Sequence, residues 1–201
     1  MRVIPLPLYI LAGGRSSRFG SDKARAVIQG QPLIRRVAGT LVPFATRITV
    51  VADVPGKYAD LGLATIADAT PHQGPMGGLA TALADCEVAS GSSWLLLVAC
   101  DLVDIRSVWV DRLLAHTRGG AAGRNAVVFM GQRWEPLLAL YHTSILPEVT
   151  QRMTQGDRAM QRLLETLATV AVPLPADWPT IAQINTHEDW LACRRASSSR
   201  A

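Results

Sequence analysis

The stretch WLLLVA, Trp94–Ala99, is an unbroken apolar run that lies between Ser93 and Asp101. An apolar run of strand length without alternation is typical of a parallel strand that is covered by helices on both faces. The segments before it alternate between strand-like and helical patterns, as expected of an α/β protein. We therefore predict a three-layer α/β fold with a mostly parallel sheet, in which this stretch is a central strand.

Further strands and helices are predicted on both sides of this run from the spacing of apolar residues. The expected strands are Tyr9–Ala12, Arg47–Ala52 and Leu63–Ala67 before it, and Asn125–Met130 and Trp134–Tyr141 after it. Only Gly131-Gln132-Arg133 separates the last two strands, so they form a hairpin or a short antiparallel excursion. The expected helices begin near Pro32 and at Leu79, and cover Ala159–Leu167 and Glu188–Arg194.

The composition indicates one folded domain. The chain has 201 residues, of which 49% are hydrophobic and 18% are charged, so it is long enough and apolar enough to bury a core. We expect one domain over residues 1–195 and a frayed tail of small and polar residues over 196–201.

Charge and cysteine usage argue against several classes of partner. The net charge of +4 includes three arginines in the last eight residues, and no block of Lys and Arg follows a helix, so we expect no nucleic-acid partner. No stretch approaches the about 20 apolar residues that span a membrane. The three cysteines show no CxxC spacing, which disfavours a disulfide framework or a zinc site and indicates a cytoplasmic protein.

A glycine-rich stretch, LAGGRSSRFGSDKA, follows the first predicted strand and covers Leu11–Ala24. A turn of this kind points backbone N–H groups into the space beyond the strand, where open α/β sheets bind ligands. Its spacing fits neither the GxGxxG dinucleotide motif nor the GxxxxGK[ST] phosphate loop. With Arg15, Arg18 and Lys23 nearby, it is a candidate polyphosphate site; the alternative is a surface turn with solvated arginines.

Asp101 follows the central apolar run directly after Cys100. In a parallel sheet this places the carboxylate at the same edge as the glycine-rich stretch, where a buried charge needs a cation beside it. Mg²⁺ held by one or two carboxylates and phosphate oxygens is a common companion. The alternative is an Asp that caps the next helix.

The sequence resembles the molybdenum cofactor guanylyltransferases in several motifs. LAGGRSSRFGSDKA is similar to their LAGGxSxRMGxDK motif, with Phe19 in place of the usual Met. The other similar stretches, in family order along nearly the whole chain, are GPMGG at 74–78, Cys100-Asp101, EPLLALY at 135–141 and Ile184-Asn185-Thr186. The resemblance implies a Rossmann-like fold of the nucleotide-diphospho-sugar transferase type. It also implies transfer of GMP from GTP to molybdopterin with release of pyrophosphate, by Mg²⁺-assisted in-line attack on the α-phosphate.

The resemblance also assigns roles to individual residues. Asp101 matches the Mg²⁺ ligand, and Arg18 occupies the family's arginine position. The residues implied to bind the nucleotide, its phosphates, the metal or the pterin are Leu11, Ala12, Gly13, Gly14, Lys23, Asp68, Asp101 and Asn185. Arg15 and Arg18 are added because their charge would stabilise departing pyrophosphate, and Arg18, Lys23 and Asp101 are the candidate catalytic residues. Asp68 has an equal alternative as a turn-capping residue.

Three further positions, besides Phe19, depart from the family pattern. Some relatives carry an Asn after the second predicted strand that contacts the nucleotide, and here Asp53 either takes over that contact or the contact is absent. The CDxP stretch lacks its Pro at Val103, and His187 replaces Pro in INTHED. These changes bear on loop shape more than on chemistry.

Two other functions and several other uses of single residues stay open. A cytidylyltransferase would use CTP, although its relatives tend to read LAAG at positions 11–14. A non-catalytic module would bind GTP or carry the finished cofactor to a molybdoenzyme or its chaperone. Among single residues, Cys100 is either a thiol nucleophile or a small buried residue, and Trp134 and Tyr141 either stack on a pterin or pack in the core.

Overall fold

A mostly parallel sheet lies at the centre of the protein. The computed structural model describes residues 5–13, 22–102, 104–117, 123–178 and 188–191. In this part of the chain, one seven-stranded sheet has the order β5-β4-β1-β6-β8-β7-β9. Its strands are β1 Leu6–Leu11, β4 Ala45–Ala52, β5 Ala64–Ala67, β6 Trp94–Ala99, β7 Ala126–Met130, β8 Trp134–His142 and β9 Thr169–Pro173.

Only β8 among these seven strands runs against its neighbours. It pairs antiparallel with β6 and with β7, whereas β1 with β4, β1 with β6, β4 with β5 and β7 with β9 are parallel pairs. The predicted mostly parallel sheet is therefore confirmed. The predicted central strand is confirmed as well, because β6 spans Trp94–Ala99, is buried at every position and lies between β1 and β8.

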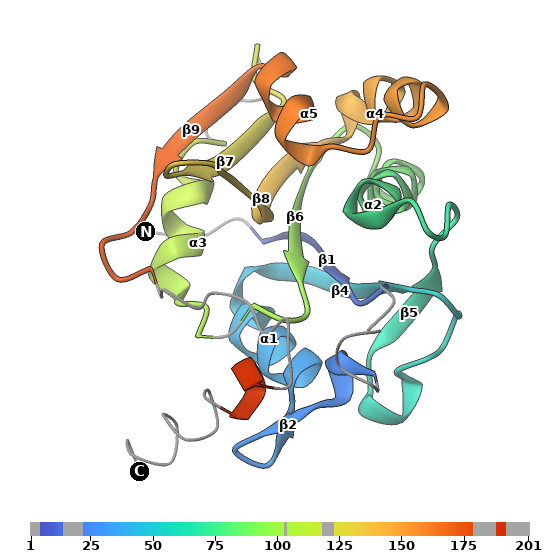
Figure 1. Ribbon diagram of the computed structural model, residues 1–201, viewed down its shortest axis with the longest axis vertical. Helices are drawn as coiled ribbons and strands as arrows, with labels where there is room; N and C mark the ends of the chain where they lie inside the picture. Colours follow the sequence, from blue (N-terminus) through green and yellow to red (C-terminus); the bar gives the residue numbers. More distant parts are fainter. Residues whose placement is uncertain (1–4, 14–21, 103, 118–122, 179–187, 192–201) are drawn as a thin grey trace.

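Helices cover both faces of the sheet, as Figure 1 shows. The helices are α1 Leu33–Leu41, α2 Gly74–Ser90, α3 Ser107–Leu114, α4 Leu146–Thr154 and α5 Met160–Thr166. Apart from Leu33, the buried apolar residues of α1 belong with those of α3 to one hydrophobic cluster, and those of α2, α4 and α5 belong to another. The sheet lies between these clusters, so the predicted three-layer arrangement is confirmed.

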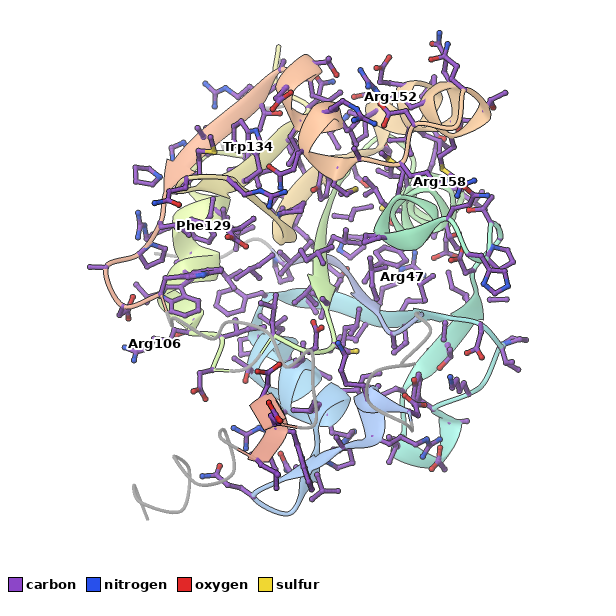
Figure 2. All side chains as sticks on the ribbon, in the orientation of Figure 1. Arg47, Arg106, Phe129, Trp134, Arg152 and Arg158 are labelled. Carbon is purple, nitrogen blue, oxygen red and sulfur yellow. The ribbon has the colours of Figure 1, made fainter. Side chains whose placement is uncertain are left out.

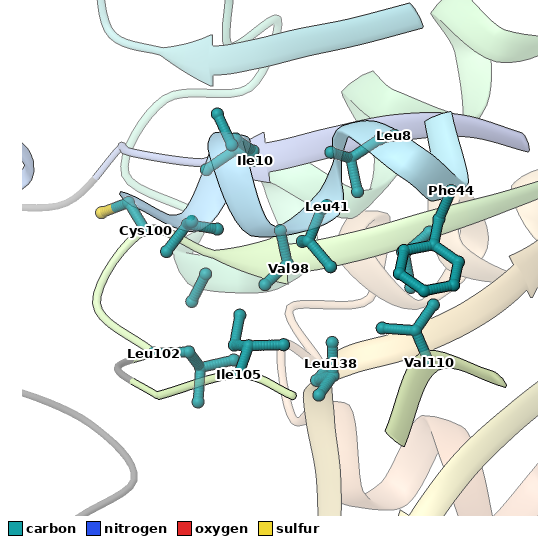
Figure 3. Close-up of a cluster of buried hydrophobic side chains, with 14 of the residues drawn as sticks. Leu8, Ile10, Leu41, Phe44, Val98, Cys100, Leu102, Ile105, Val110 and Leu138 are labelled. Carbon is teal, nitrogen blue, oxygen red and sulfur yellow. The ribbon is translucent and has the colours of Figure 1, made fainter. Parts of the chain in front are cut away.

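The alternation of side chains along the strands divides the core. Leu8 and Ile10 of β1 and Val98 of β6 face the α1 and α3 side, where they pack with Leu41 and Leu138 (Figure 3). In α1, apolar residues recur three or four positions apart, so one stripe of the helix is buried on the sheet.

A polar cluster connects α2 to the face of the sheet that α2 covers. The hydroxyl of Tyr9 on β1 donates to Asp85 Oδ2 of α2 over 2.6 Å. Arg47 on β4 lies beneath α2 (Figure 2), and its Nη2 donates to Asp85 Oδ2 over 2.8 Å and to the Tyr9 hydroxyl. These contacts fix α2 relative to β1 and β4.

Some elements differ from the sequence-based predictions. Helix α2 begins at Gly74 with Pro75 in its first turn, so the predicted start at Leu79 is wrong by five residues. Helices α3 and α4, strand β9 and the small hairpin of β2 Val27–Ile28 and β3 Gln31–Pro32 were not predicted. The predicted helix over 188–194 is helical at 188–191. Its last residues and the predicted tail over 196–201 lie outside the described part of the chain.

Within the described ranges, no helix combines the length and the apolar content that a membrane span needs.

Candidate functional site

Strands β1 and β6 bring the two candidate motifs to one edge of the sheet. Leu11 and Ala99, the last residues of these parallel strands, are paired in register. The backbone N–H of Cys100 donates to the carbonyl of Leu11 over 3.0 Å, and the N–H of Ala12 donates to Val51 over 2.9 Å. The start of the glycine-rich stretch and Asp101 therefore leave the sheet side by side.

Lys23 and Asp101 meet at this edge. Lys23 Nζ lies 2.5 Å from Asp101 Oδ2, and the two side chains are 19% and 11% exposed. The other carboxylate oxygen, Oδ1, is buried and accepts no hydrogen bond from the described residues. The geometry thus brings together one cation and one carboxylate that the sequence assigned to phosphate and to metal, and leaves a buried acceptor oxygen beside them.

Asp22 holds Lys23 in place. It lies at the N-terminal cap of a short 3-10 helix, η1 Lys23–Arg25, and its Oδ1 accepts from the N–H of Ala24 over 3.1 Å. The hydroxyl of Tyr58 donates to Asp22 Oδ2 over 3.0 Å. Burial raises the pKa of Tyr58 above its usual range, and the negative charge of Asp22 adds to this shift. These contacts of Asp22 therefore fix the turn from which the side chain of Lys23 extends.

Asp53 and Lys57 extend these contacts past the end of β4. Lys57 Nζ lies 2.8 Å from Asp53 Oδ1 and 3.5 Å from Asp22 Oδ2. The hydrogen bond from Lys57 lowers the pKa of Asp53 below its ordinary value. Asp53, which is 61% exposed, is therefore an ionised carboxylate at the same edge of the sheet.

Two glycines at the start of α2 allow close packing against this edge. A Cβ on Gly77 would lie 2.7 Å from the carbonyl oxygen of Thr70, and one on Gly78 would lie 2.8 Å from Leu11 Cδ2. Real Cβ atoms do not make contacts this short. The GPMGG stretch therefore places the first turns of α2 against the segment after β5 and against the last residue of β1.

Asp68 caps the turn between β5 and α2. Its Oδ1 accepts from the N–H of Thr70 over 2.9 Å and from the hydroxyl of Thr81 over 3.1 Å. Its backbone N–H donates to the carbonyl of Ala52 over 2.6 Å. The turn-capping use of Asp68 is thus present in the structure, and a nucleotide contact would involve its other oxygen.

A model of the MobA-like NTP transferase domain matches residues 8–171. The chain belongs to this family of nucleotidyltransferases. It is 38% identical over 170 residues to a probable molybdenum cofactor guanylyltransferase of Deinococcus radiodurans, covering 85% of this chain and 84% of that protein. It is 30% identical over 185 residues to the molybdenum cofactor guanylyltransferase of Serratia proteamaculans, covering 90% of each.

Solved structures support the same fold. The chain resembles molybdopterin-guanine dinucleotide biosynthesis protein A of Archaeoglobus fulgidus with a TM-score of 0.75 and 23% identity, over 96% of this chain and 100% of that one. It also resembles a CMP:2-keto-3-deoxy-manno-octonic acid synthetase solved with CTP, with a TM-score of 0.71 and 14% identity, over 98% of this chain and 100% of that one. This nucleotidyltransferase therefore has the nucleotide-diphospho-sugar transferase fold that the sequence predicted.

The donor atoms beside Lys23 and Asp101 are compatible with Mg²⁺. Among the described residues, no group of three or more His, Cys, Asp or Glu side chains could hold a metal ion. Mg²⁺ does not need such a cage, because it is usually bound by one or two carboxylates together with phosphate oxygens and water. Asp101, with a buried oxygen that no described donor satisfies, fits this mode of binding.

The structure also decides between alternative uses of single residues. Cys100 is buried, and burial, with a smaller effect of Asp101, raises the pKa of its thiol from 9.0 to about 12. Such a thiol stays protonated at neutral pH and is a poor nucleophile. Tyr141 is fully buried and donates to the carbonyl of Pro136 over 3.0 Å, while Trp134 is partly buried against the core. The packing alternatives hold for Cys100 and Tyr141, and the two alternatives for the partly buried Trp134 stay open.

Four of the candidate site residues cannot be placed. Gly14, Arg15, Arg18 and Asn185 lie outside the described part of the chain, as does His187. Their assignments rest on the sequence alone.

Sequence reasoning missed Asp22, Lys57 and Tyr58 as parts of the site. A signal existed for Asp22, because Asp is a preferred helix-capping residue and stands directly before Lys23. Nothing in the sequence indicates that Tyr58, 36 positions away, would contact it.

Proposed function

We propose that this nucleotidyltransferase transfers GMP from GTP to molybdopterin and releases pyrophosphate. The observation that carries the proposal is the pairing of Lys23 and Asp101 at the edge of the sheet where β1 and β6 end. The printed names of the relatives that cover most of the chain supply the nucleotide and the acceptor.

The proposed reaction needs no covalent intermediate with the protein. An oxygen of the terminal phosphate of molybdopterin attacks the α-phosphorus of GTP, the new P–O bond forms, and the bond to the β-phosphate breaks. The electrons of the broken bond leave with pyrophosphate. The protein's task is therefore to hold the two substrates in line and to stabilise negative charge. The protonated thiol of Cys100 agrees with such a route.

Each residue of the site has a task in this proposal. The backbone of Leu11, Ala12 and Gly13 positions the nucleotide, since it leads away from the end of β1. The ammonium of Lys23 binds the phosphates and follows the negative charge onto the leaving group. Arg18, and with it Arg15, adds positive charge for the same purpose, and Gly14, Asp68 and Asn185 contact the ligands.

Asp101 would hold Mg²⁺ when the metal binds. The ion supplies neutralisation of charge on the phosphate oxygens. Because Lys23 occupies Oδ2, the buried Oδ1 is the oxygen of Asp101 that remains for the metal.

The nucleotide specificity gives the test. Molybdopterin is incubated with the protein, Mg²⁺, and either GTP or CTP, and pyrophosphate release and the dinucleotide formed are measured. We expect transfer with GTP at least about tenfold faster than with CTP. Equal rates with the two nucleotides would contradict a guanylyltransferase, and faster transfer with CTP would show a cytidylyltransferase. Tight GTP binding without any transfer would show the non-catalytic module.

A further inference from the structure

A hollow of about 390 Å³ lies between helix α1 and the segment that follows β6. Its volume falls in the range of about 300–1,000 Å³ typical of small-molecule sites. Leu102 and Asp104, which follow Asp101 in the sequence, line one side, and residues of β3 and α1 line the other. Two residues of its lining therefore lie within three positions of the candidate metal ligand in the sequence. Among the residues that the structure describes, none of those proposed to bind GTP lines this hollow.

The walls of the hollow are polar. Arg36 and Gln31 contribute a cation and an amide, Thr40 a hydroxyl, and Asp104 a carboxylate. Arg36 Nη2 lies 4.0 Å from Asp104 Oδ1, and Arg36 Nη1 donates to Gln29 Oε1 over 2.9 Å. The side chain of Asp104 is 58% exposed, and the 4.0 Å contact with Arg36 is too long for a hydrogen bond. Its carboxylate can therefore accept N–H groups of a ligand.

Apolar side chains line the hollow as well. Leu102 and Ile105 are buried members of the hydrophobic cluster on the α1 side of the sheet (Figure 3), and Val37 of α1, from the same cluster, also lines the hollow. Asp104 has a φ of 58°, in the left-handed region that few non-glycine residues adopt. This conformation costs energy, and such residues are concentrated at ligand-binding segments.

We propose that this hollow is the subsite for the acceptor, and that it binds the pterin of molybdopterin. This inference rests on the proposed function. A pterin is a flat bicycle whose 2-amino-4-oxo edge carries adjacent N–H donors, and two adjacent donors match the carboxylate of Asp104. Its faces fit the apolar side chains, and Arg36 can pair with its exocyclic oxygen or with the phosphate. The phosphate then lies toward Asp101 and Lys23.

A glycine at the wall allows the hollow to be blocked from one side. A Cβ added at Gly39 of α1 would meet no atom within 4 Å, and this residue lines the hollow. In Gly39→Trp the indole occupies the space that we assign to the pterin. Gly39→Ala is the matched control, because it adds one methyl group at the same helical position and leaves most of the volume open.

The experiment measures the KM for molybdopterin and, separately, the Kd for GTP. We expect Gly39→Trp to raise the KM for molybdopterin at least about tenfold, with the Kd for GTP within about twofold of the wild-type value. Gly39→Ala should raise the KM for molybdopterin much less than Gly39→Trp does, because it fills only the volume of one methyl group. A second variant, Asp104→Asn, keeps the size of an exposed side chain and should raise the same KM about tenfold, because an amide offers one acceptor atom instead of two.

The outcomes separate this inference from the proposed function. If the wild-type protein transfers GMP to molybdopterin and both Gly39→Trp and Asp104→Asn keep the wild-type KM, the hollow is not the acceptor subsite, although the proposed function stands. If the wild-type protein neither binds molybdopterin nor transfers GMP to it, the proposed function fails and this inference fails with it. Loss of folding in Gly39→Trp, detected by thermal unfolding, leaves Asp104→Asn to decide.

Discussion

The ammonium of Lys23 and the carboxylate of Asp101 lie 2.5 Å apart, although the two residues are 78 positions apart in the sequence. The contact exists because β1 and β6 are parallel neighbours whose last residues pair in register. The turn that begins at Asp22 then carries Lys23 back over the end of β6. The same contact joins the two motifs that the sequence assigned to phosphate and to metal.

The stability of this ion pair can be measured with a double-mutant cycle. Lys23→Met leaves the carboxylate of Asp101 without its cation, so we expect the free energy of unfolding to fall by about 2 kcal/mol. Adding Asp101→Asn removes the unpaired charge and should recover at least about 1 kcal/mol. Urea unfolding of the two single variants and the double variant gives these values, and strictly additive effects would contradict the pairing.

The glycines of GPMGG should differ in their tolerance of a methyl group. In Gly77→Ala the new Cβ meets the backbone carbonyl of Thr70, which cannot move without the turn that Asp68 caps. In Gly78→Ala it meets the flexible end of Leu11. We expect Gly77→Ala to cost about 2 kcal/mol in unfolding free energy and to raise the KM for the nucleotide, and Gly78→Ala to cost less.

Gly39→Ala is a stability control for these two variants. Gly39 lies inside α1 with open space at its Cβ, so alanine should stabilise the protein by about 0.5–1 kcal/mol through helix propensity. Thermal unfolding of the three alanine variants under one set of conditions gives the ranking. A larger loss for Gly78→Ala than for Gly77→Ala would refute the packing described for the start of α2.

The thiol of Cys100 should be inert while the protein is folded. Burial raises its pKa from 9.0 to about 12, so the neutral thiol is favoured in the folded state. In Cys193→Ser, a thiol reagent at pH 8 should modify neither Cys86 nor Cys100, both of which are buried, until urea is added. Rapid modification of Cys100 in the folded protein would contradict its burial.

The same raised pKa predicts how stability depends on pH. Because the folded protein holds the thiol proton more tightly than the unfolded chain does, this contribution is complete below pH 9 and is lost between pH 9 and pH 12. The difference in unfolding free energy between the wild-type protein and Cys100→Ala should shrink over this range. The control is the same comparison at pH 7 and pH 8, where the difference should be constant.

The polar cluster under α2 should matter for stability and not for transfer. Tyr9→Phe removes one hydroxyl and leaves Arg47 and Asp85 paired, so we expect a loss of about 1 kcal/mol. Arg47→Met leaves Asp85 without its cation and should cost about 2 kcal/mol or more, with the KM for GTP unchanged. Urea unfolding and initial rates test this, and a Tyr9→Phe variant that folds normally but loses transfer would show a role in the site.

The fold could be predicted where a pattern depends on burial alone. Strand β6 was predicted with its observed bounds because both of its faces are covered, so every position had to be apolar. Helix α2 was predicted to start too late because Gly74, Pro75, Gly77 and Gly78 have low helix propensity. Gly77 and Gly78 are needed there because α2 closely approaches Thr70 and Leu11, which only the tertiary structure shows.

The candidate site could likewise be predicted only in part from the sequence. Lys23 and Asp101 could be predicted because each follows a strand that ends at the same edge of the sheet. The contacts of Asp22 with Tyr58 and Lys57 could not, because they depend on where the turn after β4 places those side chains. Helix α4 and strand β9 were missed because half-exposed segments carry weaker apolar patterns.

If Lys23 and Asp101 form the catalytic centre, Asp101→Asn should lose transfer, and the rate of pyrophosphate release from GTP with molybdopterin tests this most directly. The asparagine keeps the shape of the side chain and removes its charge. We expect a loss of at least about 100-fold relative to the wild-type protein, with cooperative unfolding and GTP binding retained. A folded Asp101→Asn variant that forms the dinucleotide within about threefold of the wild-type rate would contradict this assignment.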